Sequence, residues 1–249
     1  AVVANIPFDA LSSFVNETRT SKLVRYVEPN FRFHADFTPN DPDFHFQYGL
    51  TKIEADKAWD MQRGSSKVLV AIVDTGIDWN HPDLTANYVP LGYDWVNHDY
   101  DPMDDNGHGT HVAGIIGAAT NNNIGIAGLA QVRIMAEKAL DSQGNGYEDQ
   151  LAHAIINATD AGANIISMSW GDYANSTLIF DAVKYAYNAG VLLTAAAGND
   201  AVSTKMFPAA YNEVIAVTAT DSYDSPAWFT NFGNWVELAA PGVNIWSTY

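Results

Sequence analysis

The sequence contains no cysteine and few basic residues, and both shortages narrow the possible functions. Without cysteine, the chain can form neither a disulfide bond nor a zinc site or nucleophile that depends on a thiolate. Only 12 lysine and arginine residues stand against 29 aspartate and glutamate residues, which gives a formal net charge of −17. This excess argues against nucleic acid or an anionic membrane surface as a partner. Long apolar runs are also lacking, so no membrane-spanning helix is expected.

The residues that are present indicate a globular protein with a large core. Hydrophobic residues make up 47% of the 249 positions and aromatic residues 12%, far more than a disordered chain contains. The surplus carboxylates have two interpretations, a solvated acidic surface or specific cation sites, and composition alone favours neither.

From Lys67 onward, patterns typical of strands alternate with patterns typical of helices. Residues 68–73 form a continuous apolar run that predicts a strand buried on both faces. Apolar residues at helical spacing between residues 151 and 161, and again between 179 and 189, predict two amphipathic helices. Further strands are expected over residues 164–168, 191–195 and 214–217. Alternating β and α elements predict an α/β fold, a three-layer sandwich with a mostly parallel central sheet flanked by helices.

The first 36 residues differ from the rest. A short amphipathic stretch over residues 8–15 precedes residues 22–28, whose β-branched and aromatic side chains before Pro29 predict a strand. Thirty-six residues are too few to fold alone. We therefore expect a separate segment over residues 1–36 and a main domain over residues 37–249.

Three short segments contain side chains suited to catalysis. Asp74 directly follows the buried strand over residues 68–73, and Gly76 permits a sharp turn there. His108 stands where a helix is expected to begin, with Val112, Ile115, Ile116 and Ala119 on its buried face. Asn199 follows a strand that ends in small residues, where an amide could stabilise an oxyanion.

Each of these residues also has a plain structural interpretation. Asp74 alone is more simply a turn residue, and an aspartic protease would need a second Asp-Thr-Gly triplet, which the chain lacks. His108 alone is more simply a structural histidine. A zinc site with His111 lacks a third ligand at recognisable spacing. Asn199 alone is more simply a turn asparagine.

Taken together and in this order, the segments resemble the motifs of the subtilase family of serine proteases, and in particular its thermitase-like subgroup. The resemblance covers residues 37–249. The segments that match are the aspartate motif (residues 73–78 with 81–84), the histidine motif (residues 106–114) and the oxyanion asparagine motif (residues 196–199). It implies a subtilisin-like fold in which Asp74 orients His108, His108 acts as general base, and Asn199 stabilises the oxyanion.

The resemblance also implies substrate-binding and calcium-binding residues. The expected substrate-binding residues are Gly144, Asn145, Gly146, Ser169, Trp170, Gly171, Ala196, Ala197 and Gly198. One Ca²⁺ site is expected from Asp41, Asp83, Asn122 and the carbonyls of Ala119, Ile124 and Ile126. A second is expected from Asp94, Asn97, Asp99 and Asp101.

The family's nucleophile lies in a Gly-Thr-Ser motif that this sequence does not contain. Family spacing would place that serine roughly 10–20 residues past Tyr249. We therefore expect a fragment, incomplete at the C-terminus and inactive as it stands. Ser169 and Ser247 lie in segments that match other parts of the family.

Residues 1–36 resemble the tail of the family's inhibitory propeptide, with cleavage expected near His34 to Phe37. The implied protein is a secreted, monomeric endopeptidase that acts on polypeptides and binds its own propeptide in the active-site cleft. The alternative is a non-catalytic protein of the same fold that binds peptides, and a third reading is a calcium-binding structural module.

Overall fold

The computed structural model describes residues 2–31 and 37–249, and the chain divides into two compact units, residues 1–36 and 37–249. The first unit contains a short 3-10 helix, η1 (Phe8–Ala10), followed by α1 (Leu11–Arg19). The strand predicted over residues 22–28 is wrong, because these residues form turns and irregular backbone. A strand needs a hydrogen-bonded neighbour, and the described residues of this unit provide none; Leu23 is accordingly 97% exposed.

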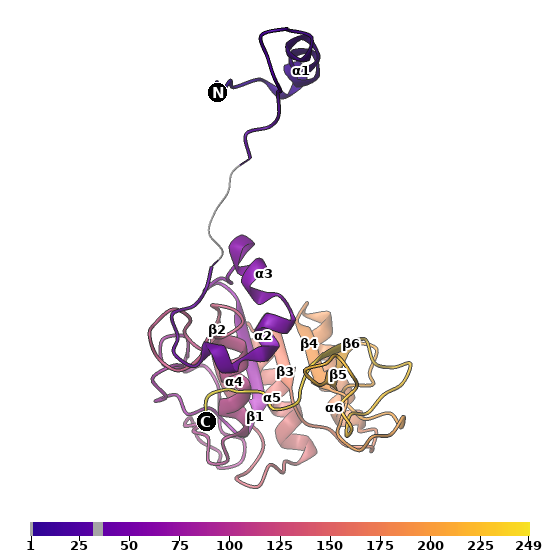
Figure 1. Ribbon diagram of the computed structural model, residues 1–249. Coiled ribbons are helices and arrows are strands. Elements are labelled where there is room, and N and C mark those ends of the chain that lie inside the picture. Colours follow the sequence, from indigo (N-terminus) through magenta and orange to yellow (C-terminus); the bar gives the residue numbers. More distant parts are fainter. Residues whose placement is uncertain (1, 32–36) are drawn as a thin grey trace. The chain divides into compact units, whose positions relative to one another are not determined.

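A six-stranded, all-parallel sheet is the centre of the second unit (Figure 1). The strand order is β2-β1-β3-β4-β5-β6. The strands are β1 (Leu69–Asp74), β2 (Arg133–Lys138), β3 (Ile165–Met168), β4 (Leu192–Ala196), β5 (Val214–Thr220) and β6 (Leu238–Pro241). The four predicted strands are present, and the sequence patterns missed β2 and β6. Because all strands run in one direction, their carboxyl ends meet at one edge of the sheet.

Helices cover both faces of this sheet and complete a three-layer α/β sandwich, as predicted. The side chains of β1 alternate between two cores: Leu69 and Val73 pack with α5 (Glu148–Asp160) and α6 (Thr177–Asn188), whereas Ile72 packs with residues of α4 (His108–Gly117). The remaining helices are η2 (Phe44–Phe46), α2 (Tyr48–Lys52) and α3 (Ala55–Met61). In the part of the chain that the structure describes, no helix is both long and apolar enough to cross a lipid bilayer.

Helix α4 lies against the sheet through small residues. The expected apolar face is only half-buried at Val112, Ile115 and Ile116. The most buried helical positions are instead Gly109, Thr110, Ala113, Gly114 and Gly117. A Cβ atom at Gly109 would lie 2.0 Å from the carbonyl oxygen of Gly76. Because Gly109 has no side chain, the start of α4 can lie close to the turn that follows β1.

Candidate active site

The closest approach between β1 and α4 brings Asp74 and His108 together. The Nδ1 atom of His108 lies 2.7 Å from Oδ1 of Asp74, which also accepts a hydrogen bond from the backbone N–H of Thr75 at 2.8 Å. Asp74 is fully buried, whereas the side chain of His108 is 49% exposed. Because a carboxylate only accepts hydrogen bonds, this contact assigns the proton of a neutral imidazole to Nδ1. The lone pair of Nε2 is then free to accept a proton.

The electrostatic environment of the pair suits a general base. The hydrogen bond to Asp74 raises the pKa of His108 above its usual 6.5, although burial opposes the increase. The second carboxylate oxygen of Asp74, Oδ2, is buried without a hydrogen-bond partner in the described structure. Asp74 therefore directs its hydrogen-bonded oxygen toward the ring and holds one tautomer of His108 in place.

A second polar network fixes the start of α4 and was missed by the sequence analysis. Asp104 accepts hydrogen bonds from the hydroxyl of Thr75 at 2.8 Å and from that of Thr110 at 2.6 Å. The Thr75 hydroxyl in turn accepts the backbone N–H of Gly109 at 2.9 Å. Burial tends to raise the pKa of Asp104, but hydrogen bonds from Gly107, Thr110 and Asn106 hold it below its usual value. The only sequence signal for this role is the position of Asp104 just before the histidine motif.

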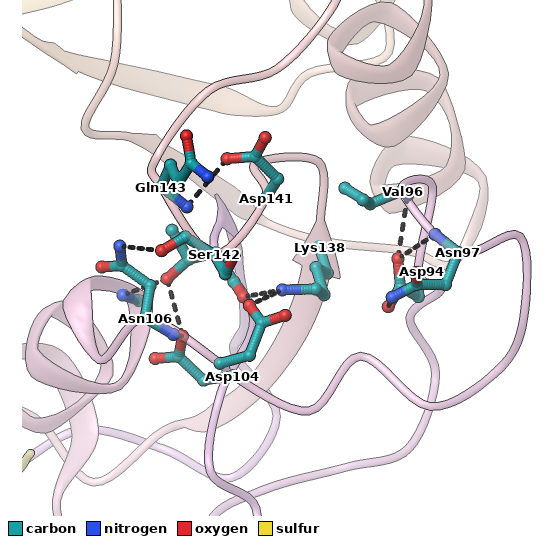
Figure 2. A network of polar contacts seen from close by, with 12 residues as sticks. Asp94, Val96, Asn97, Asp104, Asn106, Lys138, Asp141, Ser142 and Gln143 are labelled. Atoms are coloured by element: carbon teal, nitrogen blue, oxygen red, sulfur yellow. Dashed lines mark hydrogen bonds and ion pairs between the residues drawn. The ribbon is translucent and has the colours of Figure 1, made fainter.

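Figure 2 shows further contacts around Asp104 and Asn106, where the segment before α4 meets the loop after β2. Lys138, at the end of β2, is 1% exposed and donates from Nζ to the carbonyl oxygen of Thr75 at 2.7 Å and to Oδ1 of Asp105 at 2.5 Å. The side-chain amide of Asn106 donates to the carbonyl oxygen of Ser142 at 3.0 Å. These contacts connect the residue after Asp74 and the segment just before His108 to the end of β2 and to the loop that follows it.

Asn199 lies beyond the end of β4, at the same edge of the sheet as Asp74. Only β3 separates β4 from β1. The side chain of Asn199 is exposed, whereas Ala197 and Gly198 before it are buried. The structure therefore presents an amide to solvent at the edge where His108 is located.

A cavity of about 400 Å³ opens at this edge beside the loop after β2. Gly144, Asn145 and Gly146 form one wall, and Trp170 and Gly171 form the other. The indole N–H of Trp170 donates to the carbonyl oxygen of Val73 at 3.0 Å, which fixes this wall to the strand that ends in Asp74. Five of the nine expected substrate-binding residues thus surround one hollow.

The other four expected substrate-binding residues lie outside that lining. Ser169 directly follows β3, Ala196 is the last residue of β4, and Ala197 and Gly198 continue from it. They occupy the carboxyl ends of the two strands between β1 and β5, but the 400 Å³ cavity does not reach them.

His111 and Ser247 have hydrogen-bond partners other than His108. The Nε2 atom of His111 lies 3.1 Å from the carbonyl oxygen of Ile245, so His111 and His108 have different partners. The hydroxyl of Ser247 donates its hydrogen bond to the carbonyl oxygen of His111 at 2.7 Å and not to His108. The zinc interpretation therefore gains no support from the described residues.

The first expected calcium site contains two buried carboxylates, those of Asp41 and Asp83. Asn122 joins them, since its backbone N–H donates to Asp41 at 3.2 Å and its side-chain amide to Asp83 at 2.8 Å. Burial raises the pKa of Asp83, and hydrogen bonds from Ile126 and Asn122 oppose this increase. The negative charge of Asp41 raises it further. In the described structure, neither carboxylate forms a salt bridge with lysine or arginine.

This donor set fits a hard cation. Two buried carboxylates that repel each other, both bonded to the loop of residues 119–126 with its backbone carbonyls, match the oxygen ligands that Ca²⁺ prefers. Ala119 also belongs to this neighbourhood, because its N–H donates to the carbonyl oxygen of Asp83 at 2.8 Å. Ile124 and Ile126 lie on the same loop. The described residues contain no group of three or more acidic, histidine or cysteine side chains placed for a metal, so carbonyls would have to complete this site.

In the second expected calcium loop the carboxylates have separate local partners. Both oxygens of Asp94 accept hydrogen bonds within the loop, including one from the side-chain amide of Asn97 at 2.9 Å (Figure 2). Asp99 accepts the N–H of Asp101 at 2.8 Å, and Asp101 accepts the indole N–H of Trp79 at 3.0 Å. Although Asp94 and Asp99 are paired through their backbones, the described residues contain no group of three acids placed for a metal in this loop.

Comparison with known proteins identifies the family to which this chain belongs. Residues 65–249 match the sequence model of the subtilase family. The chain is 49% identical over 240 residues to the thermophilic serine proteinase of Bacillus sp. (strain AK1), covering 96% of this chain and 60% of that protein. It is 46% identical over 215 residues to thermitase of Thermoactinomyces vulgaris, covering 86% of this chain and 76% of thermitase.

Solved structures agree with this result. A protease of Pseudoalteromonas arctica PAMC 21717 superimposes with a TM-score of 0.77 at 30% identity, covering 83% of this chain and 73% of that one. The chain thus spans only part of the length of its relatives. The chain belongs to the subtilase family and is thermitase-like within it.

Proposed function

We propose that the full-length protein is a secreted, calcium-binding serine endopeptidase in which Asp74, His108 and a serine beyond Tyr249 form the catalytic triad. The observation that carries the proposal is the 2.7 Å contact between Asp74 and Nδ1 of His108, with the exposed ring at the carboxyl edge of the sheet. Relatives of this chain include proteins named as extracellular proteases, which supports secretion.

In the proposed reaction, Nε2 of His108 takes the proton from the serine hydroxyl as the serine oxygen bonds to the carbonyl carbon of the substrate. The carbonyl oxygen becomes negatively charged, and the side-chain amide of Asn199 with a backbone N–H donates hydrogen bonds to it. When the C–N bond breaks, His108 returns the proton to the leaving amine. Water then hydrolyses the acyl-enzyme by the same steps in reverse order.

The substrate is proposed to be an extended polypeptide with mainly apolar side chains. Leu140, Leu151, Ile179 and Phe207 contribute apolar surface to the cavity, while Gly144, where a Cβ atom would meet no atom within 4 Å, leaves room for the backbone of a peptide. Asp200, which could otherwise favour basic side chains, is not among the lining residues, and its carboxylate accepts the hydroxyl of Tyr173 at 2.5 Å.

Residues 1–36 are proposed to be the tail of an inhibitory propeptide that binds in the active-site cleft. Cleavage is proposed near His34 to Phe37, and His34 to Asp36 lie outside the described residues. Phe37 begins the second unit, where its N–H donates to Asp60 at 3.1 Å and its ring packs edge-on against Trp59. These contacts hold Phe37 within the second unit, which supports a cleavage on the N-terminal side of that unit.

Ca²⁺ is proposed to bind at Asp41 and Asp83, with Asn122 and the carbonyls of Ala119, Ile124 and Ile126, and at the loop with Asp94, Asn97, Asp99 and Asp101. When bound it would supply stability rather than chemistry, because an ion that binds only the native state shifts the folding equilibrium. The buried, mutually repelling carboxylates of Asp41 and Asp83 support the first site more strongly than the second loop is supported, where only Asp94 is buried and Asp99 and Asp101 are exposed.

The proposal is tested by peptide hydrolysis with the full-length protein and its His108→Ala variant. Loss of a triad histidine in this family lowers kcat by a factor on the order of 10⁶, so His108→Ala should abolish measurable turnover. His111→Ala is the matched control, because its ring binds the carbonyl of Ile245 instead of Asp74. Full-length protein that binds peptides without cleaving them would instead support a non-catalytic peptide-binding protein.

A further inference from the structure

A buried asparagine, Asn231, stands behind the segment that carries Asn199. We define the Asn199 loop as residues 197–202. Asn231 is 0% exposed and lies in the sequence after β5, more than thirty positions from Asn199. An amide buried in a protein interior is costly unless its hydrogen bonds are satisfied. The partners of Asn231 therefore indicate what it does.

The hydrogen bonds of Asn231 to the Asn199 loop fall on both sides of Asn199. Its backbone N–H donates to the carbonyl oxygen of Gly198 at 2.9 Å, and its Nδ2 donates to that of Ala197 at 3.0 Å. Its Oδ1 accepts the N–H of Asp200 at 2.9 Å and that of Val202 at 3.2 Å. One residue thus fixes the peptide groups immediately before and after Asn199.

Gly198 shows how tightly Asn231 and the loop fit. Gly198 has φ = +106°, and a Cβ atom there would lie 2.4 Å from Nδ2 of Asn231 and 2.3 Å from Sδ of Met206. The loop can therefore approach the amide this closely only with glycine at this position. The Asn231 side chain occupies the space into which the loop would otherwise relax.

Asn231 is itself held in place by β5 and by its neighbours. The hydroxyl of Thr218, on β5, donates to the carbonyl oxygen of Asn231 at 2.6 Å. On either side, Ala201 donates to the carbonyl oxygen of Phe229 at 2.7 Å, and Phe232 donates to that of Val202 at 3.1 Å. The contact between Asn231 and the loop is therefore part of a continuous hydrogen-bonded layer anchored to the sheet.

We propose that Asn231 is a positioning residue for catalysis, which acts through Asn199 by fixing the backbone that presents its amide. The inference rests on the proposed function, because it assigns Asn199 the oxyanion. An oxyanion donor contributes through its preorganised geometry, so a loop free to shift by about 0.5 Å would weaken the stabilisation of the transition state. Asn231 does not touch the substrate, so its loss should lower kcat more than it changes KM.

The test is a double-mutant cycle in the full-length enzyme with Asn231→Ala, Asn199→Ala and the combination. Loss of the oxyanion donor is expected to lower kcat about 10²–10³-fold. Asn231→Ala should lower kcat roughly 10-fold or more with KM changed less than about threefold. If Asn231 acts through Asn199, adding Asn231→Ala to Asn199→Ala should lower kcat by no more than about twofold further.

A matched control separates this role from general destabilisation. Asn87 also donates from its side-chain amide to a backbone carbonyl, that of Gly117 at 3.0 Å, away from the active site. Asn87→Ala should lower the melting temperature without lowering kcat. Should Asn231→Ala fail to fold, the same cycle with Asn231→Asp decides, because aspartate keeps the acceptor for Asp200 and Val202 and removes the amide that donates to Ala197 and to the hydroxyl of Tyr173.

The proposal is overturned if the Asn231 variant retains parental kcat, or if it reduces kcat by the same factor with and without Asn199. Failure of the underlying function has a different signature. The parent enzyme would then show no peptide hydrolysis, or Asn199→Ala alone would leave kcat unchanged.

Discussion

At the residue scale, the proposed chemistry depends on the proton of one imidazole. The hydrogen bond to Asp74 raises the pKa of His108 above 6.5, and only the neutral ring can accept a proton from serine. We predict that kcat/KM of the full-length enzyme rises with pH through an apparent pKa above 6.5. Asp74→Asn should move this limb to lower pH while lowering kcat by about 10⁴-fold.

The raised pKa of His108 also affects stability, and here the contribution falls with rising pH whereas activity rises. A histidine whose pKa is raised by folding stabilises the native state below its unfolded pKa, and this contribution is lost as pH rises through the folded value. The pair should therefore stabilise the protein most in acid, where the enzyme is inactive. If kcat/KM of the parent enzyme instead rose with an apparent pKa at or below 6.5, that result would contradict the hydrogen bond between Asp74 and His108.

Glu137 provides a second titration, unrelated to catalysis. It is fully buried on β2, where burial raises its pKa to about 8 although Trp95 and Asn157 donate hydrogen bonds to its carboxylate at 2.8 and 2.7 Å. Because the unfolded pKa is near 4.5, folding takes up a proton between these values and stability falls as pH rises through this window.

We predict that Glu137→Gln makes the melting temperature less dependent on pH between about 5 and 8. Glutamine has the shape of the protonated acid, and the amide of Asn157 can turn to present its oxygen to it. Thermal unfolding at pH 5, 7 and 9 measures the effect. A variant whose melting temperature falls as steeply as that of the parent would show that Glu137 is not the group responsible.

At the element scale, the position of α4 depends on glycines that face the sheet. A Cβ atom at Gly109 would lie 2.0 Å from the carbonyl oxygen of Gly76, a backbone atom that cannot turn away. Gly109→Ala should therefore move the start of α4 away from Asp74, lowering kcat and destabilising the fold by roughly 1–3 kcal/mol.

Gly117→Ala is the matched control on the same helix face. There the nearest atom is a methyl group of Ile134 at 3.0 Å, which belongs to a side chain that can adjust. Alanine also favours helix by up to about 1 kcal/mol, so this variant should keep parental kcat and lose less stability. Equal losses in kcat for the two variants would argue against a close helix approach as the reason for Gly109.

The sequence predicted those elements whose pattern is set by the layers of the fold. The run of β1 was recognisable because residues of two cores enclose it, and β3, β4 and β5 because buried apolar residues recur at every second position. The apolar faces of α5 and α6 were recognisable because they pack into one of these cores. Strand β2 was missed because it carries Arg133, Glu137 and Lys138, whose burial depends on tertiary partners. The short β6 lacks β-branched residues.

The pairing of Asp74 with His108 was predictable for a different reason. Asp74 and His108 lie in segments whose residue types and order are distinctive, and the structure joins them as expected. Lys138 and Asn231 support the site through contacts between distant segments, so nothing local in the sequence marks them, and Asp104 is marked only by its position just before the histidine motif. The buried face of α4 was predicted only in part: Val112 and Ile116 do pack against the core, but its most buried positions include glycines, which give no apolar signal.

At the scale of the whole molecule, stability should depend on calcium. The buried carboxylates of Asp41 and Asp83 repel each other unless a cation lies between them. We predict that Ca²⁺ raises the melting temperature of the full-length protein and that a chelator lowers it.

The two proposed calcium sites can be separated by matched variants. Asp83→Asn should remove most of the calcium dependence, whereas Asp99→Asn, in the exposed loop, should remove little of it. Differential scanning calorimetry with calcium and with chelator measures both. If the melting temperature of the parent is the same with calcium and with chelator, the calcium proposal fails for both sites.

Activation of a serine by the Asp74–His108 pair is tested most directly by covalent labelling of the full-length protein. A fluorophosphonate reacts with a serine whose hydroxyl is deprotonated by a neighbouring base, and mass spectrometry then identifies the modified residue. We predict one labelled serine beyond Tyr249, with labelling lost in His108→Ala and retained in His111→Ala. Absence of labelling in the parent, or labelling that persists without His108, would contradict the account.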